Sequence, residues 1–239
     1  MNKTLGIIQP GRIGDLIISL PIAKYYHDRG YKVVWPIAAP FVKSFSFAAD
    51  YVQFIPVRHS HVSDTTEWHK TSEWILNQFD CDKKLDLLFN MTDTEVASRG
   101  WKESKLNWDE YRYKLAEVPF DEKWNLVINR NKERELRLYD TVVKQDKYIV
   151  AHTQASAVRR TIELSQEILS EYQVVNLTQI TDNIFDWTMV LEKAAKLILI
   201  DSCFANLVEQ LGIGGSNKVL LHKGQDFALP IMRSKWRVV

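Results

Sequence analysis

Short apolar runs alternate with helix-like segments from the first residues of the chain onward. The runs are six or seven residues long and rich in branched and aromatic side chains, as in strands buried on both faces. In the first part of the chain they lie at 4–9 ("TLGIIQ"), 31–37 ("YKVVWPI"), 51–57 ("YVQFIPV") and 85–90 ("LDLLFN"). Strands that alternate with helices are typical of parallel β-α-β units.

Two helices are predicted between these strands. Apolar residues recur at helical spacing over 15–29, with Gly30 as a stop signal, and Pro21 inside this span predicts a kink or a break. The second helix covers 64–79, where Asp64 and Glu67 have the spacing of a capping box.

The alternation weakens between about 91 and 145, where charged and aromatic residues mix, and we interpret this part as an insertion and linker that is helical in part. Regular alternation then resumes. It predicts strands at 147–153, 173–178, 196–202 and 218–223, and helices at 161–172, 185–194 and 204–211. We therefore expect an α/β protein with two Rossmann-like domains, 1–145 and 146–239, whose parallel sheets face each other across a cleft. Ligands of such sheets bind at the carboxyl ends of the strands.

Composition narrows the class of protein. The 239 residues include 31 basic and 30 acidic ones, so net charge gives no general attraction to nucleic acid. Cys81 and Cys203 are too few and too far apart for a disulfide framework or a zinc site, so we expect a reducing, cytoplasmic setting. No apolar run reaches the roughly 18 residues of a membrane span, so any membrane contact is expected to be peripheral, at the inner face of the membrane.

The first candidate motif is "PGRIGD" (10–15), between the first strand and the first helix. Gly11 and Gly14 fit neither the dinucleotide-binding fingerprint nor the P-loop pattern. The residues alone favour a tight turn with Asp15 as the helix N-cap, a contribution of about 1 kcal/mol.

The second candidate motif is "DSCFANLVEQLG" (201–212), which ends a predicted strand and opens a helix. Asp201 and Ser202 would thus lie beside the free N–H groups of a helix N-terminus, a natural phosphate site.

This segment resembles the signature Asp-Ser-Gly-Pro-Met-His-Leu-Ala-Ala-Ala-Leu-Gly of glycosyltransferase family 9, the heptosyltransferase-like enzymes of GT-B fold. The residues that match in register are Asp201, Ser202, Leu207, Leu211 and Gly212. Asn206 replaces the family's His, and Cys203 and Phe204 replace its Gly-Pro.

Other parts of the chain resemble the same family. "GRIGDLIISLPIAKYY" (11–26) resembles its Gly-Asp-hydrophobic-Leu-Pro opening, and "YIVAHTQASAVRR" (148–160) resembles the strand and basic loop that begin its second domain. The middle third shows no resemblance. The helices that cross back to the first domain in many GT-B chains are expected to be absent or reduced after "DFALPIMRSKWRVV".

The resemblance implies an inverting transfer of a sugar from a nucleotide-diphosphate sugar to an acceptor hydroxyl, with no metal and no other cofactor. It implies that Asp15 is the general base and that Gly11, Arg12 and Gly14 line the acceptor side. The donor side would comprise Asp201, Ser202 and Asn206, one of the adjacent Arg159 and Arg160, and the strand-end residues Thr153 and Gln154. Alternatively, Thr153 and Gln154 belong to a polar loop at the end of the strand and do not bind the donor.

The expected acceptor is a glycan, such as a lipid-linked saccharide of the lipopolysaccharide core. Two alternatives are the glycosylation of hydroxylated bases in modified phage DNA and a nucleotide-binding module without turnover. Asp15 argues against the second alternative, because a module that only binds has no need of an acid there beyond capping.

The remaining motifs are weaker. "DCD" (80–82) has the metal-binding Asp-x-Asp pattern but precedes a strand rather than ending one. His59 and His61 fit a surface loop, and His69 has no partner at four-residue spacing on its helix, so we interpret all three as structural or incidental. The aromatic and basic residues of 99–114 would suit the stacking of sugars or bases, but an amphipathic surface helix is the simpler interpretation.

Overall fold

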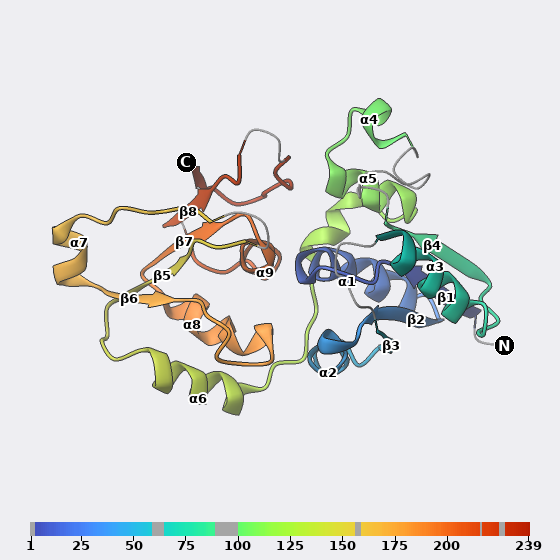
Figure 1. Cartoon of the computed structure of the whole chain (residues 1–239), viewed down its shortest axis with the longest axis horizontal. Helices are drawn as coiled ribbons and strands as arrows, with labels where there is room; N and C mark the ends of the chain where they lie inside the picture. The colour runs from blue at the N-terminus through green and yellow to red at the C-terminus, as the bar shows by residue number, and fades with distance from the viewer. Residues whose placement is uncertain (1–2, 59–64, 89–99, 156–158, 216, 225–227) are drawn as a thin grey trace. The chain divides into compact units, whose positions relative to one another are not determined.

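The computed structural model describes residues 3–58, 65–88, 100–155, 159–215, 217–224 and 228–239. The chain divides into two compact units, Met1–Asn129 and Arg130–Val239 (Figure 1). Each unit is built on its own parallel sheet, so the predicted α/β class with two Rossmann-like sheets is confirmed.

The first sheet has the strand order β3-β2-β1-β4, and all of its neighbouring strands are parallel. Its strands are β1 (Lys3–Ile8), β2 (Tyr31–Ala38), β3 (Val52–Val57) and β4 (Lys83–Asp86). β4 begins two residues before the predicted strand and ends at Asp86, and residues 89 and 90 of that prediction lie outside the described residues. The main helices between the strands are α1 (Ile13–His27), α2 (Ala39–Ala48) and α3 (Thr65–Leu76).

Of the kink or break predicted at Pro21, the break is wrong, because α1 runs through this residue without interruption, and the kink stays a prediction. A proline inside a helix removes one backbone hydrogen bond. Here Leu16, Ile17, Leu20 and Ile22 are fully buried, and the packing of such side chains outweighs one missing hydrogen bond.

Helix α2 was not predicted, although Pro40 in its first turn is a start signal, because its sequence has no capping side chain and few buried positions. Ala38 is the N-cap residue and makes no side-chain cap, and of the ten helix residues only Ser44, Phe45 and Ala48 are buried. Helix α3 confirms the prediction over most of its length, while the capping residue Asp64 lies outside the described residues.

The segment 100–145 is helical in part, as predicted, and is shared between the two units. The short helix α4 (Trp101–Ser104), α5 (Trp108–Leu115) and the 3-10 helix η2 (Phe120–Trp124) belong to the first unit. α6 (Lys132–Val142) belongs to the second, where Arg134 forms an ion pair with Asp186 at 2.7 Å. The division therefore lies between 129 and 130, whereas the sequence suggested 145 and 146.

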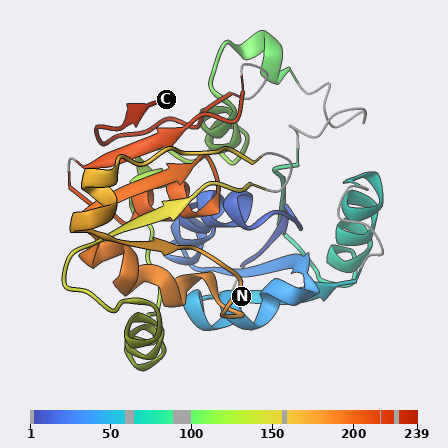
Figure 2. The ribbon, with the colours of Figure 1, turned by 60° about the vertical axis from the view of Figure 1, so that its left-hand side comes forward.

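The second sheet has the strand order β6-β5-β7-β8-β9 and is parallel throughout (Figure 2). Its strands are β5 (Tyr148–His152), β6 (Gln173–Asn176), β7 (Lys196–Ile200), β8 (Lys218–Leu221) and β9 (Arg237–Val238). Its helical elements are α7 (Gln166–Glu171), the 3-10 helix η3 (Ile184–Trp187), α8 (Thr188–Lys193) and α9 (Cys203–Gln210).

Two features of this unit differ from the prediction. The helix expected over 161–172 begins only at Gln166, because Ser165 is its N-cap and accepts a hydrogen bond from the Ile168 N–H. β9 was not predicted, and it adds residues near the end of the sequence to the sheet.

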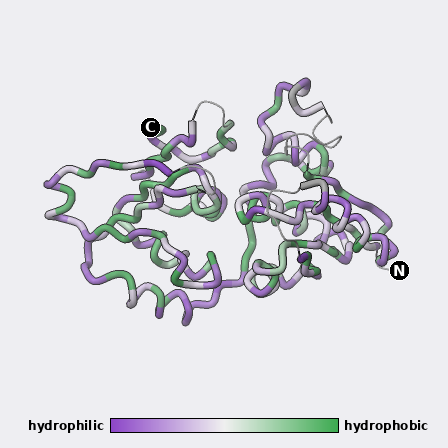
Figure 3. Tube along the Cα trace, viewed as in Figure 1, coloured by the Kyte–Doolittle hydropathy of each residue, from purple (hydrophilic) through white to green (hydrophobic). Residues whose placement is uncertain are grey.

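The core follows the inner strands of both sheets. Leu5, Ile7, Val34, Leu197 and Leu199 have no exposed surface. In Figure 3 the hydrophobic colour accordingly follows the strands and α1, whereas α6 is largely hydrophilic.

Candidate functional site

In the first unit, the residues singled out by sequence lie just after the carboxyl end of β1. Gly11 packs against the indole ring of Trp68 on α3 so closely that a Cβ at Gly11 would lie 1.3 Å from a ring carbon. Arg12, the exposed next residue, has a φ of 59°, an unusual value for a residue with a side chain. A glycine that admits no side chain, followed by a strained residue, fixes the path of the chain into α1.

Asp15 is the third residue of α1 and not its N-cap, so the capping prediction is wrong. The N-cap is Arg12, whose side chain makes no cap, and Gly14 lies between the two in the first turn. An acidic side chain in the first turn still interacts favourably with the helix dipole.

The partner of Asp15 comes from far along the sequence. Nη2 of Arg112, on α5, donates to Oδ1 of Asp15 at 2.8 Å. Nη1 of Arg112 donates to the Asp15 carbonyl at 3.1 Å and to Oγ of Ser19 at 3.3 Å. Among the described residues, Oδ2 of Asp15 accepts no hydrogen bond, and the Asp15 side chain keeps 14% of its surface exposed.

Arg112 has no exposed surface, and its guanidinium lies 5.2 Å from the centre of the Trp108 ring. Neither this arginine nor its pairing with Asp15 was predicted. Arg112 lies in the segment 99–114 that we considered for stacking, but Tyr111 and Tyr113 are buried and do not present their rings to a ligand. The helical spacing in "WDEYRYK" is the only signal that marks 112 as an inward position.

The weaker motifs of this unit also have partners. Oδ2 of Asp82, the last residue of "DCD", accepts the Thr4 N–H at 2.7 Å, which is a structural role at the amino end of β1. Nε2 of His69 lies 2.6 Å from Oδ2 of Asp86 at the carboxyl end of β4. His69 thus has a partner on a strand, which spacing along its own helix does not reveal. His59 and His61 lie outside the described residues.

In the second unit, candidate residues gather at the carboxyl ends of β5, β7 and β8. β7 leads into Asp201 and Ser202, and Ser202 is the N-cap of α9. Its hydroxyl makes no cap and lies 3.1 Å from Nδ1 of His152, the last residue of β5. Phe204 packs edge-on against the His152 ring at a centroid distance of 4.9 Å.

His152 was not predicted, although it ends the strand adjacent to β7. Burial lowers the pKa of His152 to about 4, so the imidazole is neutral at physiological pH. A neutral imidazole and a hydroxyl side by side offer hydrogen bonds without adding charge.

Asn206, in the first turns of α9, is buried and turned back toward the N-cap. Its Nδ2 donates to the Ser202 carbonyl at 3.0 Å. Its Oδ1 is buried and has no hydrogen-bond partner among the described residues. A buried acceptor of this kind is costly unless it finds a donor.

Asp201 is buried, and Oδ2 of its carboxylate lies 3.3 Å from Nζ of Lys223, just after β8. Lys223 was not predicted. Strand order explains the meeting, because β7 and β8 are parallel neighbours and their carboxyl ends lie at the same edge of the sheet.

The loop after β5 separates the two arginines that sequence left undecided. The Arg160 N–H donates to the Thr153 carbonyl at 2.7 Å, and Nε of Arg160 donates to the His222 carbonyl at 2.8 Å. Arg159 forms a β-bridge with Gln154, and its exposed guanidinium makes no hydrogen bond within the described residues. The fold therefore orients Arg160, whose two Nη groups make no hydrogen bond among those residues.

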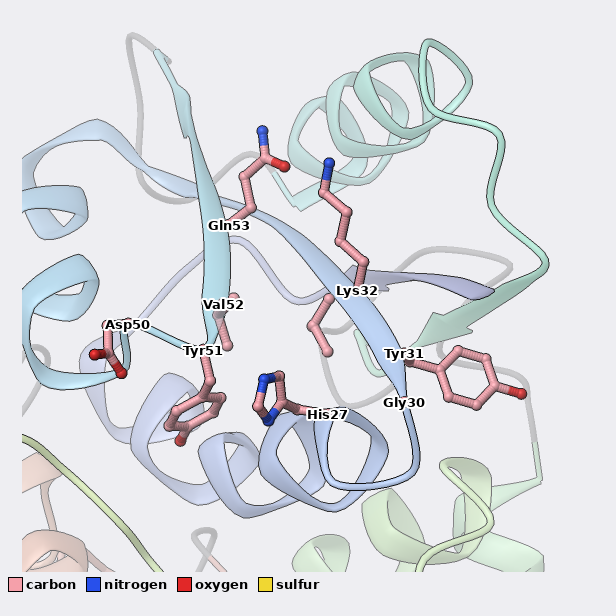
Figure 4. A pocket seen from close by; sticks show the side chains of 9 residues that line it. His27, Gly30, Tyr31, Lys32, Asp50, Tyr51, Val52 and Gln53 are labelled. Atoms are coloured by element: carbon pink, nitrogen blue, oxygen red, sulfur yellow. The ribbon is translucent and has the colours of Figure 1, made fainter. Parts of the chain in front are cut away.

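A cavity of about 460 Å³ lies elsewhere, at the amino ends of β2 and β3 (Figure 4). His27 and Tyr51 lie side by side in it, with ring centroids 5.6 Å apart, and Lys32 and Gln53 project from the two strands. Because ligands of parallel sheets bind at the carboxyl ends, we do not include this cavity in the candidate site.

The described residues contain no group of three or more His, Cys, Asp or Glu side chains placed to hold a metal ion. No helix in the same residues has the length and apolar character needed to cross a membrane.

No family model matches the chain, and no curated protein sequence matches it. Solved structures do. A glycosyltransferase family 9 protein from Veillonella parvula matches with a TM-score of 0.62 at 12% identity, over 100% of this chain and 87% of that one. The E. coli heptosyltransferase WaaC, solved with ADP-2-deoxy-2-fluoro heptose, matches with a TM-score of 0.56 at 14% identity, over 99% and 92% of the two chains.

A third match is the iron-containing dodecameric glycosyltransferase TibC from enterotoxigenic E. coli, with a TM-score of 0.56 at 12% identity, over 92% of this chain and 58% of that one. At such identities the matches show the fold. The chain has the GT-B fold of glycosyltransferase family 9 structures, as its sequence predicted.

Proposed function

We propose that the protein is a glycosyltransferase that moves a sugar from a nucleotide-diphosphate sugar to an acceptor hydroxyl, with inversion and without a metal. The observation that carries the proposal is the position of the candidate groups. Asp15 follows the carboxyl end of one parallel sheet, and Ser202 and Arg160 lie at the carboxyl end of the other, in a fold that matches glycosyltransferase structures over the whole chain.

Asp15 would act as the general base. The reaction needs an acceptor for the hydroxyl proton, and the base must be within hydrogen-bond reach of that proton. Arg112 engages Oδ1 of Asp15 at 2.8 Å, which orients the carboxylate and leaves Oδ2 for the acceptor hydroxyl. Gly11, Arg12 and Gly14 would then lie on the acceptor side of the carboxylate.

The donor diphosphate would bind in the second unit. The departing diphosphate gains negative charge, which the N–H groups at the start of α9 and the Arg160 guanidinium would stabilise in place of a metal. The Ser202 hydroxyl would add a hydrogen bond at the same sheet edge, where Lys223 forms an ion pair with Asp201. Asn206 would contribute from within α9, where its Nδ2 holds the Ser202 carbonyl at the N-cap.

The acceptor would be a glycan, with a saccharide of the lipopolysaccharide core as the first candidate. The name of the WaaC structure, a heptosyltransferase with ADP-2-deoxy-2-fluoro heptose, supports a nucleotide-sugar donor, and the glycan acceptor is proposed from the resemblance of the sequence motifs alone. A peripheral contact with the inner membrane would follow if the acceptor is lipid-linked.

The proposal is tested by thermal shift with ADP-, UDP- and GDP-linked sugars. At least one should raise the melting temperature of the wild type. Arg160→Ala should bind that donor about tenfold more weakly, since it removes a charge-assisted hydrogen bond, whereas the matched variant Arg159→Ala should bind like wild type. If none of the three donors binds, the proposed function is wrong. If Arg159→Ala weakens binding and Arg160→Ala does not, the assignment of the arginine is wrong.

A further inference from the structure

The segment Arg233–Val239 contains β9, the outer strand beside β8 in the second sheet, and reaches the carboxyl end of β8, where the candidate donor site lies. β9 runs parallel to β8, with Val238 opposite Leu220. The next residue, Val239, donates its N–H to the Leu220 carbonyl at 2.9 Å and accepts the His222 N–H at 2.8 Å. The backbone of His222, just after β8, is therefore fixed by Val239.

His222 in turn holds Arg160. Its carbonyl accepts the hydrogen bond from Nε of Arg160 at 2.8 Å, and its own ring Nδ1 accepts the Gly224 N–H at 3.1 Å. A continuous chain of hydrogen bonds thus runs from Val239 through His222 to the Arg160 guanidinium. Arg160 is exposed, so this carbonyl is what restricts its long side chain.

A second anchor ties the same segment to α9. The Glu209 carboxylate, which is buried, accepts the N–H groups of Arg233 and Ser234 at 2.5 and 2.7 Å, the Ser234 hydroxyl, and Nε1 of Trp236 at 2.7 Å. Four donors on one buried carboxylate leave the segment little freedom. The N-cap of this same helix is Ser202.

We propose that the segment Arg233–Val239 is a positioning element of the donor site, which holds the Arg160 guanidinium through His222 where the donor diphosphate binds. This inference rests on the proposed function. Its physical basis is preorganisation: a guanidinium already fixed at Nε loses less conformational entropy when its Nη groups bind a diphosphate. The segment makes this contribution without touching the ligand.

The test uses two proline variants of the full chain. Val239→Pro removes the N–H that bonds to Leu220 and loosens the chain at His222. Val238→Pro is the matched control, because N–H groups alternate along an edge strand and that of Val238 points away from β8. Titration calorimetry with ADP, UDP and GDP should show about three- to tenfold weaker binding for Val239→Pro and wild-type affinity for Val238→Pro, at a temperature where circular dichroism shows both folded.

The same pair is then compared in an Arg160→Ala background, which separates positioning from general damage. The inference expects Val239→Pro to cause no further loss of affinity there, because the side chain that the segment positions is gone. An equal loss in both backgrounds, or equal affinities of the two proline variants, would overturn it. Should Val239→Pro not fold, Val239→Gly should give a smaller loss with the same dependence on Arg160.

The outcomes also distinguish this inference from the proposed function. If the wild type binds none of the three diphosphates, the donor site itself is wrong. If the wild type binds and Arg160→Ala weakens binding, but Val239→Pro does not, only the positioning role is wrong.

Discussion

Arg112 and Asp15 lie 97 residues apart in sequence and form an ion pair of 2.8 Å in which the arginine is completely buried. The guanidinium also binds the Asp15 carbonyl, so it fixes the side chain and the backbone of the same residue. Burying such a pair costs desolvation energy, so its presence does not indicate that it serves to stabilise the fold. In our account its role is to orient a carboxylate that retains exposed surface.

The pair predicts strong coupling between the two residues in stability. Arg112→Met should lower the free energy of unfolding by about 2–4 kcal/mol, because it leaves the Asp15 carboxylate without its buried partner. In an Asp15→Asn background the same change should cost at least about 1 kcal/mol less. Urea unfolding of the four proteins measures this, and additive losses would show that the two side chains do not interact as described.

Gly11 should be intolerant of the smallest side chain. A Cβ there would overlap the Trp68 ring, so Gly11→Ala should destabilise the protein by about 1–3 kcal/mol through overpacking. Gly30 is a useful control of the same substitution, since no atom lies within 4 Å of its Cβ position and only its φ of 83° opposes alanine. The double variant Gly11→Ala/Trp68→Leu should recover part of the loss in thermal unfolding; no recovery would contradict the packing described.

The lowered pKa of His152 predicts that the free energy of unfolding decreases at acidic pH. Its pKa is about 4 in the folded chain, against 6.5 for the free side chain, so below pH 6.5 the unfolded state takes up a proton that the folded state does not. Stability is therefore lost as the pH falls from 6.5 toward 4, by up to about 1.4 kcal/mol per pH unit from this group. His152→Gln should show a shallower loss between pH 6.5 and 4.5 in urea unfolding, and an unchanged slope would contradict the pKa.

Local signals in the sequence suffice for most of the parallel strands and for the ends of several helices. Gly30 follows α1 closely, and the buried strands around Leu5, Val34 and Leu199 have the expected apolar runs. Two local predictions failed for a physical reason. Pro21 does not break α1, because tertiary packing outweighs propensity, and Asp15 does not cap α1, because the strained turn at Arg12 begins the helix two residues earlier than expected.

The candidate site was predictable only where its residues follow strand ends. Asp201, Ser202 and the loop of Arg160 could be found in this way, because parallel strands bring their carboxyl ends to one edge. Arg112 could not, since its position depends on how the segment after 100 packs against α1. His152 ends β5 and Lys223 follows β8. Their neighbours depend on the strand order β5-β7-β8, which cannot be predicted from the local sequence.

Mass spectrometry of the acceptor tests most directly whether Asp15 serves as the base in sugar transfer. The protein and the donor that binds in the thermal-shift experiment are incubated with lipopolysaccharide core oligosaccharide or, separately, with hydroxymethylated DNA. Wild-type protein should add the mass of one sugar to the oligosaccharide, whereas Asp15→Asn should bind the donor equally well and transfer about 10²–10⁴-fold more slowly. A mass increase on the DNA alone would show that the acceptor is modified DNA rather than a glycan. Transfer by Asp15→Asn at the wild-type rate would contradict the role of Asp15 as the base.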